Sequence, residues 1–139
     1  MTRTITIEHG DKTLYGHVAT IESTTLGFES HGILSAYLAL SWGSNGISVG
    51  GYCLDQPRDR DADDYTRIGT AFGMDHIIRI LETVGVESWE KLKGQQVIAL
   101  FEGKNSWGSV AVGIAHAIDE EKVLVFKEHA AEWREKESA

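Results

Sequence analysis

The stretch TAFGMDHIIRILETVG, residues 70–85, decides the fold, because it is the clearest amphipathic helix in a chain that otherwise reads as strands. The spacing i, i+3, i+4, i+7 of one helical face is followed by four apolar residues, Met74, Ile77, Ile78 and Leu81. Thr70 is a suitable N-cap, and Gly85 is a suitable C-terminal stop. The pattern predicts one principal helix over about 70–84, with this stripe buried against a sheet.

Strand patterns precede this helix. TITIEHG (4–10) and TLYGHVATI (13–21) predict an N-terminal hairpin around Gly10-Asp11-Lys12. ILSAYLAL (33–40) fits a strand better than a helix, although the helical interpretation stays open. Asn45-Gly46 favours the positive φ angles of a two-residue turn, so ISVGGYCLD (47–55) is expected to pair with it.

Strand patterns also follow the helix. Residues 88–93 predict a short helical turn closed by Gly94, and three strands are expected in QQVIALFEG (95–103), SVAVGIAHAI (109–118) and VLVF (123–126). The tail 128–139 has helical composition but few apolar anchors, so a partly frayed helix is expected there. We therefore predict a single α+β domain over 1–139, with a twisted, mainly antiparallel sheet and one principal amphipathic helix packed on it.

Composition limits the function. The 139 residues carry a formal net charge of −8, which disfavours binding to a DNA or RNA duplex. The N-terminus lacks the pattern of a signal peptide, and no apolar run approaches the roughly 20 residues that span a bilayer. The single cysteine, Cys53, excludes a disulfide framework and favours a cytosolic setting. These features predict a soluble protein that does not bind membranes.

An acidic segment separates the first strands from the helix. Five aspartates lie between positions 55 and 64, with arginines 58, 60 and 67 among and after them. The segment lacks the glycine and terminal glutamate of a calcium-binding EF-hand, and its arginines compete for the carboxylates. Residues 55–66 are therefore predicted to form an exposed acidic loop.

Catalytic and metal motifs are weak. The six histidines form no HxH, HxxxH or HExxH pattern, so neither a metal nor a cofactor is expected. Cys53 lies in a predicted strand and is expected to be a small buried hydrophobe. Glu29 and His31 stand two apart in a glycine-bounded turn, where they could transfer protons or simply bond to backbone groups. Catalysis by this pair is the weaker interpretation.

RIGTAFGMD (67–75) is the best candidate for binding an anion. The first amides of a helix lack intrahelical partners and carry partial positive charge. Four residues could contribute to this site: Arg67 a guanidinium fork, Thr70 a hydroxyl, and Gly69 and Gly73 close backbone approach. The alternative is that the stretch only caps the helix, with Asp75 paired to Arg79 at i, i+4.

Aromatic residues in or near turns extend this hypothesis. Phe28, Phe72 and Trp107 lie where a ring can be left available to stack on a base. Asn105 lies in the turn before Trp107 and joins the candidate ligand-binding residues. Each of these rings could instead close the edge of the core.

Four segments together resemble a known group of proteins: HGI (31–33), GGYCLD (50–55), GTAFGMD (69–75) and VGVESWEKLKG (84–94). The combination resembles a family of small, mostly uncharacterised proteins encoded by bacteriophages and prophages. This resemblance implies a phage accessory protein acting in the host cytoplasm, and it brings no established active site.

A second, more distant similarity concerns size, strand-rich composition, and arginines and aromatics in loops. In these respects the chain is similar to the anti-Thoeris sponges, which are compact oligomers that sequester cyclic nucleotide signals. The expectation is a counter-defence protein that binds and sequesters a small anionic, nucleotide-like signal without catalysis, as a homodimer or higher homo-oligomer. The alternative is a protein that inhibits a host defence enzyme through its acidic surface.

Overall fold

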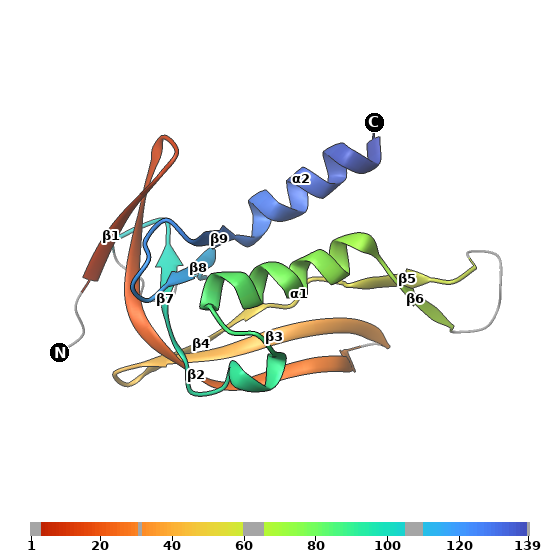
Figure 1. The fold of residues 1–139 in the computed structure, drawn as a ribbon, viewed down its shortest axis with the longest axis horizontal. Coiled ribbons are helices and arrows are strands. Elements are labelled where there is room, and N and C mark those ends of the chain that lie inside the picture. The colour runs from red at the N-terminus through yellow and green to blue at the C-terminus, as the bar shows by residue number, and fades with distance from the viewer. Residues whose placement is uncertain (1–3, 31, 60–65, 105–109, 139) are drawn as a thin grey trace.

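The computed structural model describes residues 4–30, 32–59, 66–104 and 110–138, which form a mainly antiparallel sheet with one main helix packed on it and a second helix beside the first (Figure 1). The predicted α+β class is confirmed. The strands are β1 Thr4–His9, β2 Lys12–Ser30, β3 Ile33–Trp42, β4 Asn45–Gly50, β5 Asp55–Pro57, β6 Arg67–Gly69, β7 Gln96–Phe101, β8 Gly113–His116 and β9 Val123–Val125. The helices are α1 Ala71–Val84 and α2 Phe126–Ser138, with a 3₁₀ turn at Trp89–Lys91. None of these described helices is long and apolar enough to cross a membrane.

The long strand β2 organises the main sheet, whose order is β4-β3-β2-β7-β8-β9, with β1 also paired to β2. Its first part pairs with β1 and β7, and its last part pairs with β3. A shift in register between Ile21 and Ser23 marks a bulge, which bends a strand and increases its twist. The bend is visible in Figure 1, where the two parts of β2 run in different directions.

Both predicted N-terminal hairpins are present. The β1–β2 turn uses Gly10, whose φ of 64° favours glycine. The β3–β4 turn lies at Gly43 and Ser44, because Trp42 pairs with Asn45, so it precedes the predicted Asn45-Gly46 turn by two residues. Residues 33–40 form a strand and not a helix, which decides between the two interpretations of this segment. Strand β2 continues past Gly27 up to Ser30.

Helix α1 has the predicted ends but not the predicted buried face. Thr70 caps its start and Gly85 ends it in the left-handed conformation. Met74 and Ile78, however, are 63% and 45% exposed, so the predicted stripe is wrong for these two residues. Ile77 and Leu81 are half-buried, and Leu81 packs against the main core. The face toward the interior consists of Gly73, His76, Ile80, Thr83 and Val84. A search for apolar periodicity does not find this face, because three of its five residues are a glycine, a histidine and a threonine.

The segment predicted as an exposed acidic loop is partly structured. Its start forms β5, which pairs with β6 in a separate two-stranded ribbon. Asp55 is buried and contradicts the prediction, whereas residues 56–59 are exposed as expected. Residues 60–65 lie outside the described part of the chain.

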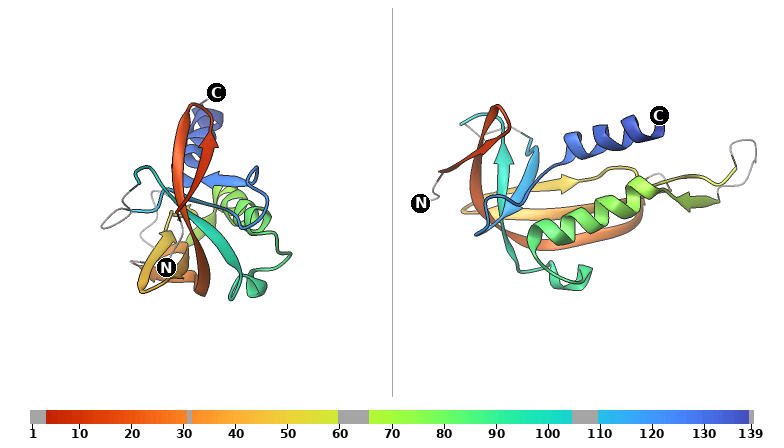
Figure 2. Two further views of the ribbon diagram at one scale, coloured as in Figure 1. Left: turned by 90° about the vertical axis from the view of Figure 1, so that its left-hand side faces the viewer. Right: turned by 45° about the horizontal axis from the view of Figure 1, so that its top comes forward.

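Helix α2 begins directly after β9 and runs beside α1 in the opposite direction (Figures 1 and 2). The first turns of α2 are anchored by two buried residues, Phe126 and His129. They are therefore more firmly held than the partly frayed helix that the sequence predicts. The helix is regular up to Ser138. The main core lies between the sheet and α1, and a second cluster lies around Ile7, Leu14 and Ile98 beside the β1–β2 hairpin.

Candidate functional site

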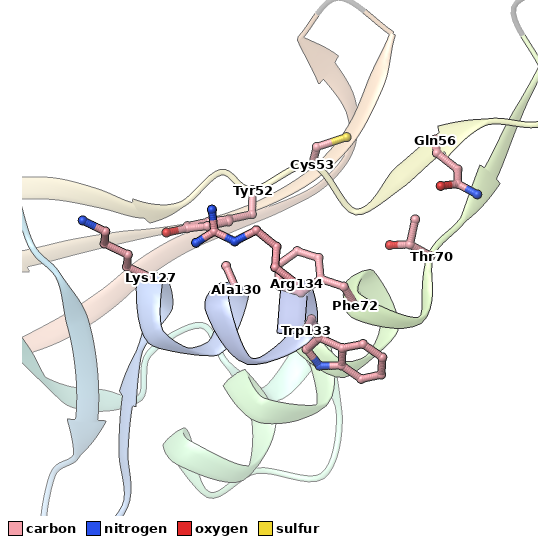
Figure 3. Close-up of a pocket in the computed structure, with 9 residues that line it drawn as sticks. All are labelled: Tyr52, Cys53, Gln56, Thr70, Phe72, Lys127, Ala130, Trp133 and Arg134. Atoms are coloured by element: carbon pink, nitrogen blue, oxygen red, sulfur yellow. The ribbon is translucent and has the colours of Figure 1, made fainter. Parts of the chain in front are cut away.

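A cleft of about 560 Å³ opens between the two helices and the segment that follows β4 (Figure 3). Its volume falls within the range of about 300–1,000 Å³ that is usual for small-molecule sites. Three parts of the chain that are distant in sequence supply its walls: the β4–β5 connection and β5, the start of α1, and α2. The lining residues are Tyr52, Cys53, Gln56, Thr70, Phe72, Lys127, Ala130, Trp133 and Arg134.

The cleft is locally cationic although the protein is acidic. Lys127 and Arg134 are seven residues apart on α2, which is close to two turns, so both side chains lie along one stripe of the helix. Figure 3 shows both extending from α2 on the side of Tyr52. Among the described residues that line the cleft, none is an aspartate or glutamate. An anion entering it therefore meets positive charge, despite the formal net charge of −8 of the whole chain.

Three aromatic rings, those of Tyr52, Phe72 and Trp133, line the cleft. The Tyr52 and Phe72 ring centroids lie 6.1 Å apart with the planes tilted by 55°. All three rings are half-buried, so each keeps some surface exposed. Rings of this kind accept a planar heterocycle by stacking, and Arg134 can add a cation–π contact.

One carboxylate, that of Asp75, joins the two helices that form walls of the cleft. Asp75 on α1 accepts two hydrogen bonds through Oδ2, from His129 Nε2 at 2.7 Å and from Trp133 Nε1 at 2.9 Å. These bonds join α2 to α1 and fix the Trp133 ring at the cleft wall. The hydrogen bond with His129 is the main reason that the pKa of Asp75 lies below its usual value. Asp75 therefore stays ionised and keeps both bonds.

Behind the Phe72 ring lies a buried histidine. His76 is 0% exposed. The centroid of its ring lies 5.6–6.2 Å from the centroids of four other rings, those of Tyr52, Phe72, Phe126 and His129. Neither of its ring nitrogens has a hydrogen-bond partner among the described residues. Burial, aided by the nearby His129, lowers the pKa of His76 to about 4. At neutral pH this histidine is an uncharged packing residue.

The predicted anion-binding arginine has another partner. Arg67 donates to Asp55 through Nε at 3.0 Å and through Nη2 at 2.9 Å, which is a bidentate pair. The Asp55 side chain is only 2% exposed, and the hydrogen bond from Arg67 is the main cause that lowers its pKa. The guanidinium of Arg67 thus compensates a buried carboxylate and is not among the residues that line the cleft.

The other residues of RIGTAFGMD also act mainly within the protein. Thr70 Oγ1 accepts from the Gly73 amide at 2.9 Å and donates to the Leu54 carbonyl at 3.0 Å, so it caps α1. Gly73 is buried against the Leu54 backbone, where a Cβ would clash, and Gly69 is exposed at the end of β6. Asp75 bonds to α2, and Arg79 faces Glu132 at 4.0 Å, so the i, i+4 Asp75–Arg79 pair is not the main contact of either residue. Only Thr70 and Phe72 of the predicted set line the cleft.

The remaining candidates lie elsewhere. Phe28 is 60% exposed on the last part of β2 and does not line the cleft. Asn105, Trp107 and His31 lie outside the described residues, and only the backbone of Glu29 is described, as part of β2. Cys53 corrects a prediction, because it is exposed and lies in the connection after β4. Its Sγ lies 3.0 Å from the Asp55 carbonyl oxygen, to which the thiol donates.

Sequence reasoning missed the contribution of α2. Trp133 and Arg134 belong to the tail 128–139, which is predicted to fray in part, and Lys127 directly precedes it. The spacing of these residues along a helix was available as a signal. Tyr52 was included in a predicted strand, and its role in the cleft follows from the way that the chain leaves β4 through Gly50 and Gly51. Both glycines have φ near 90°, which re-aims the chain toward the helices.

Comparisons with known proteins add no relative. No protein-family model, no curated protein and no solved structure matches this chain. Within the part of the chain that the structure describes, no group of three or more His, Cys, Asp or Glu side chains could hold a metal ion. The candidate site is thus defined by its own chemistry, which is that of a cationic cleft with aromatic walls.

Proposed function

We propose that this protein binds a small, nucleotide-like anion in the cleft between α1 and α2 and holds it without catalysis. The observation that carries the proposal is the combination of two basic side chains with three aromatic rings in one cleft of an acidic protein, with no acidic side chain among the lining residues that the structure describes. A nucleotide needs both features, since its phosphate seeks cations and its base seeks a flat apolar surface.

Each lining residue has a role in this proposal. Lys127 and Arg134 hold the phosphate, and Arg134 suits a bidentate contact because its guanidinium is planar. Phe72, Tyr52 and Trp133 accept the base, and each base–aromatic contact of this kind contributes about 1–3 kcal/mol. Gln56 and Thr70 supply polar atoms at the edge of the cleft. The first amides of α1 play a smaller part than expected, because Thr70 already caps Gly73.

The biological role follows from the resemblance to phage and prophage proteins together with this cleft. We propose a phage accessory protein that sequesters a nucleotide signal of a host defence system in the host cytoplasm. Sequestration predicts that a bound nucleotide is recovered unchanged after the protein is denatured. Recovery of a new product would instead assign an enzyme.

Isothermal titration calorimetry at low ionic strength tests the binding step, with AMP, adenosine and inorganic phosphate as probes. AMP is expected to bind more tightly than either half, because only AMP engages both the cations and the rings. A thermal shift provides a second readout, since ligand at about 100 times its dissociation constant adds roughly 2.7 kcal/mol of stability. No heat and no shift with AMP, ADP-ribose or cyclic dinucleotides would refute the proposal.

A matched pair of charge reversals locates the site. Lys127→Glu places an acid in the cleft, whereas Lys93→Glu makes the same change in net charge at an exposed position outside it. Lys127→Glu is expected to weaken AMP binding by tenfold or more, and Lys93→Glu to leave it within about twofold. Equal effects of the two variants would mean that only the overall charge matters.

The second candidate is a protein-binding role, which the outward-facing residues of α1 favour. Met74 and Ile78 are one turn apart and exposed, and Glu82 continues this face with a negative charge. A helix face with two exposed apolar residues and acidic neighbours suits inhibition of a host enzyme. Met74→Glu with Ile78→Glu would abolish capture of a host protein and spare AMP binding if this function is the correct one.

A further inference from the structure

A second hollow, of about 340 Å³, lies between α2 and the β1–β2 hairpin and differs in character from the cleft. Lys127 and Arg134 line both hollows, so the two lie on either side of this stripe of α2. In the described part of the chain, no ring of Phe, Tyr or Trp lines the second hollow. It is therefore unsuited to stacking a base and needs a different ligand.

The floor of this hollow is aliphatic. Leu14, which is buried, lies in it together with Val112 and Val125, and all three belong to the smaller core cluster or pack against it. Ala131 lines the hollow from α2 with only a methyl group. Val112 and Val125 are half-buried, so an aliphatic group can lie against the part of their side chains that stays accessible beside this small residue.

The rim of the hollow is polar and offers two unpaired cations. The side chains of Lys12 and Lys127 form no ion pair or hydrogen bond with any residue that the structure describes. Of the two acids on the rim, Glu128 is engaged by His9 at 2.7 Å, and Glu102 remains. Counting Arg134, the rim has more positive than negative charge at neutral pH.

We propose that this hollow binds a small amphiphilic anion, specifically an aliphatic carboxylate, with its chain on Leu14, Val112 and Val125 and its head group at Lys12 and Lys127. The volume lies near the lower end of the range for small-molecule sites, which selects a short chain over a long one. The proposal does not require that a nucleotide binds in the cleft. Because the two sites share Lys127 and Arg134, their anions compete for the same charge.

Isothermal titration calorimetry with butanoate, hexanoate and octanoate, all kept below their micellar concentrations, tests the proposal. Burial of each added methylene is expected to tighten binding about three- to fourfold. Hexan-1-ol has the chain of hexanoate without its charge and is expected to bind at least tenfold more weakly. Affinity that does not rise with chain length, or equal binding of hexanol and hexanoate, would overturn the proposal.

Two neighbouring alanines provide the matched variants. Ala131→Phe fills the proposed hollow, whereas Ala130→Phe adds the same ring on the side of the cleft. Ala131→Phe is expected to abolish hexanoate binding and Ala130→Phe to preserve it, with far-ultraviolet circular dichroism confirming that both variants fold. Lys12→Glu, at an exposed position, is a second test and is expected to weaken hexanoate at least tenfold. Hexanoate binding unchanged in both Ala131→Phe and Lys12→Glu would exclude the hollow, whatever AMP does in the cleft.

Discussion

The hydrogen bonds of Asp75 are the contacts on which the position of α2, and therefore the cleft, most depends. Asp75→Ala removes the acceptor of both His129 Nε2 and Trp133 Nε1. His129 is 1% exposed, so its ring would stay buried without this partner. We expect the variant to loosen α2 and to lower the stability of the protein.

The magnitude follows from the two bonds. A hydrogen bond to a charged group contributes about 1.5–3 kcal/mol. The Asp75 side chain is 31% exposed, so water already compensates part of its charge and the lower end of this range applies. Alanine's better helix propensity returns up to about 0.7 kcal/mol. A net loss of about 2–4 kcal/mol is therefore expected, or roughly 1–2 M in the urea midpoint.

Urea denaturation followed by circular dichroism measures this loss, and Glu132→Ala is the control. Glu132 also joins α2 to α1, but its contact with Arg79 is 4.0 Å long, and both side chains are more than a third exposed. A pair of this kind contributes about 0–1 kcal/mol. AMP binding should also weaken in Asp75→Ala but not in Glu132→Ala. If the two variants lose the same stability, the proposed anchoring role of Asp75 is wrong.

Three further predictions concern the frame of the site. Gly73→Ala should destabilise the protein by about 1–3 kcal/mol, because the added Cβ would clash with the Leu54 carbonyl. Gly69→Ala is the control and should be nearly neutral in the same denaturation assay, because there is open space around Gly69. Arg67→Ala should lower the denaturation midpoint, since it leaves a buried carboxylate unpaired, and should leave AMP affinity unchanged; weaker AMP binding in the folded variant would return Arg67 to the site. Burial lowers the pKa of His76 from 6.5 to about 4 in the folded protein. As the pH falls, the histidine is therefore protonated in the unfolded chain before it is protonated in the folded protein. The contribution of this group to stability should be fully present above pH 6.5 and should be lost as the pH drops from 6.5 toward 4. The variant His76→Phe should flatten that part of the stability profile, and an unchanged slope would assign it to another group.

The parts of the fold that sequence predicted are those set by local chemistry. The Gly10 turn, the Thr70 cap and the Gly85 stop act over a few residues, so their positions are encoded where they occur. The buried face of α1 could not be read in this way. Gly73 and His76 face inward because of what they meet, namely the Leu54 backbone and a set of aromatic rings, and neither has the apolar character that a periodicity search requires.

The candidate site was predicted only in part for the same reason. Thr70 and Phe72 were found because they lie at a helix start, which is a recognisable local feature. The sequence predicts that Arg67 binds a ligand, because its partner in the structure, Asp55, lies 12 residues away in a segment that is expected to be solvated. The contribution of Lys127 and Trp133 depends on where α2 packs, and that depends on long-range contacts such as the hydrogen bonds of Asp75 with His129 and Trp133.

Cys53 makes a direct test of the cleft possible, because it lines the cleft, is exposed, and is the only cysteine in the chain. The measurement is the rate at which a thiol reagent such as DTNB modifies the native protein, with and without AMP at a saturating concentration. A nucleotide bound between α1 and α2 covers Cys53, so the rate should fall by tenfold or more, while inorganic phosphate at the same ionic strength should leave it nearly unchanged. If calorimetry shows that AMP is bound and the rate does not change, the ligand lies elsewhere and the cleft is not its site.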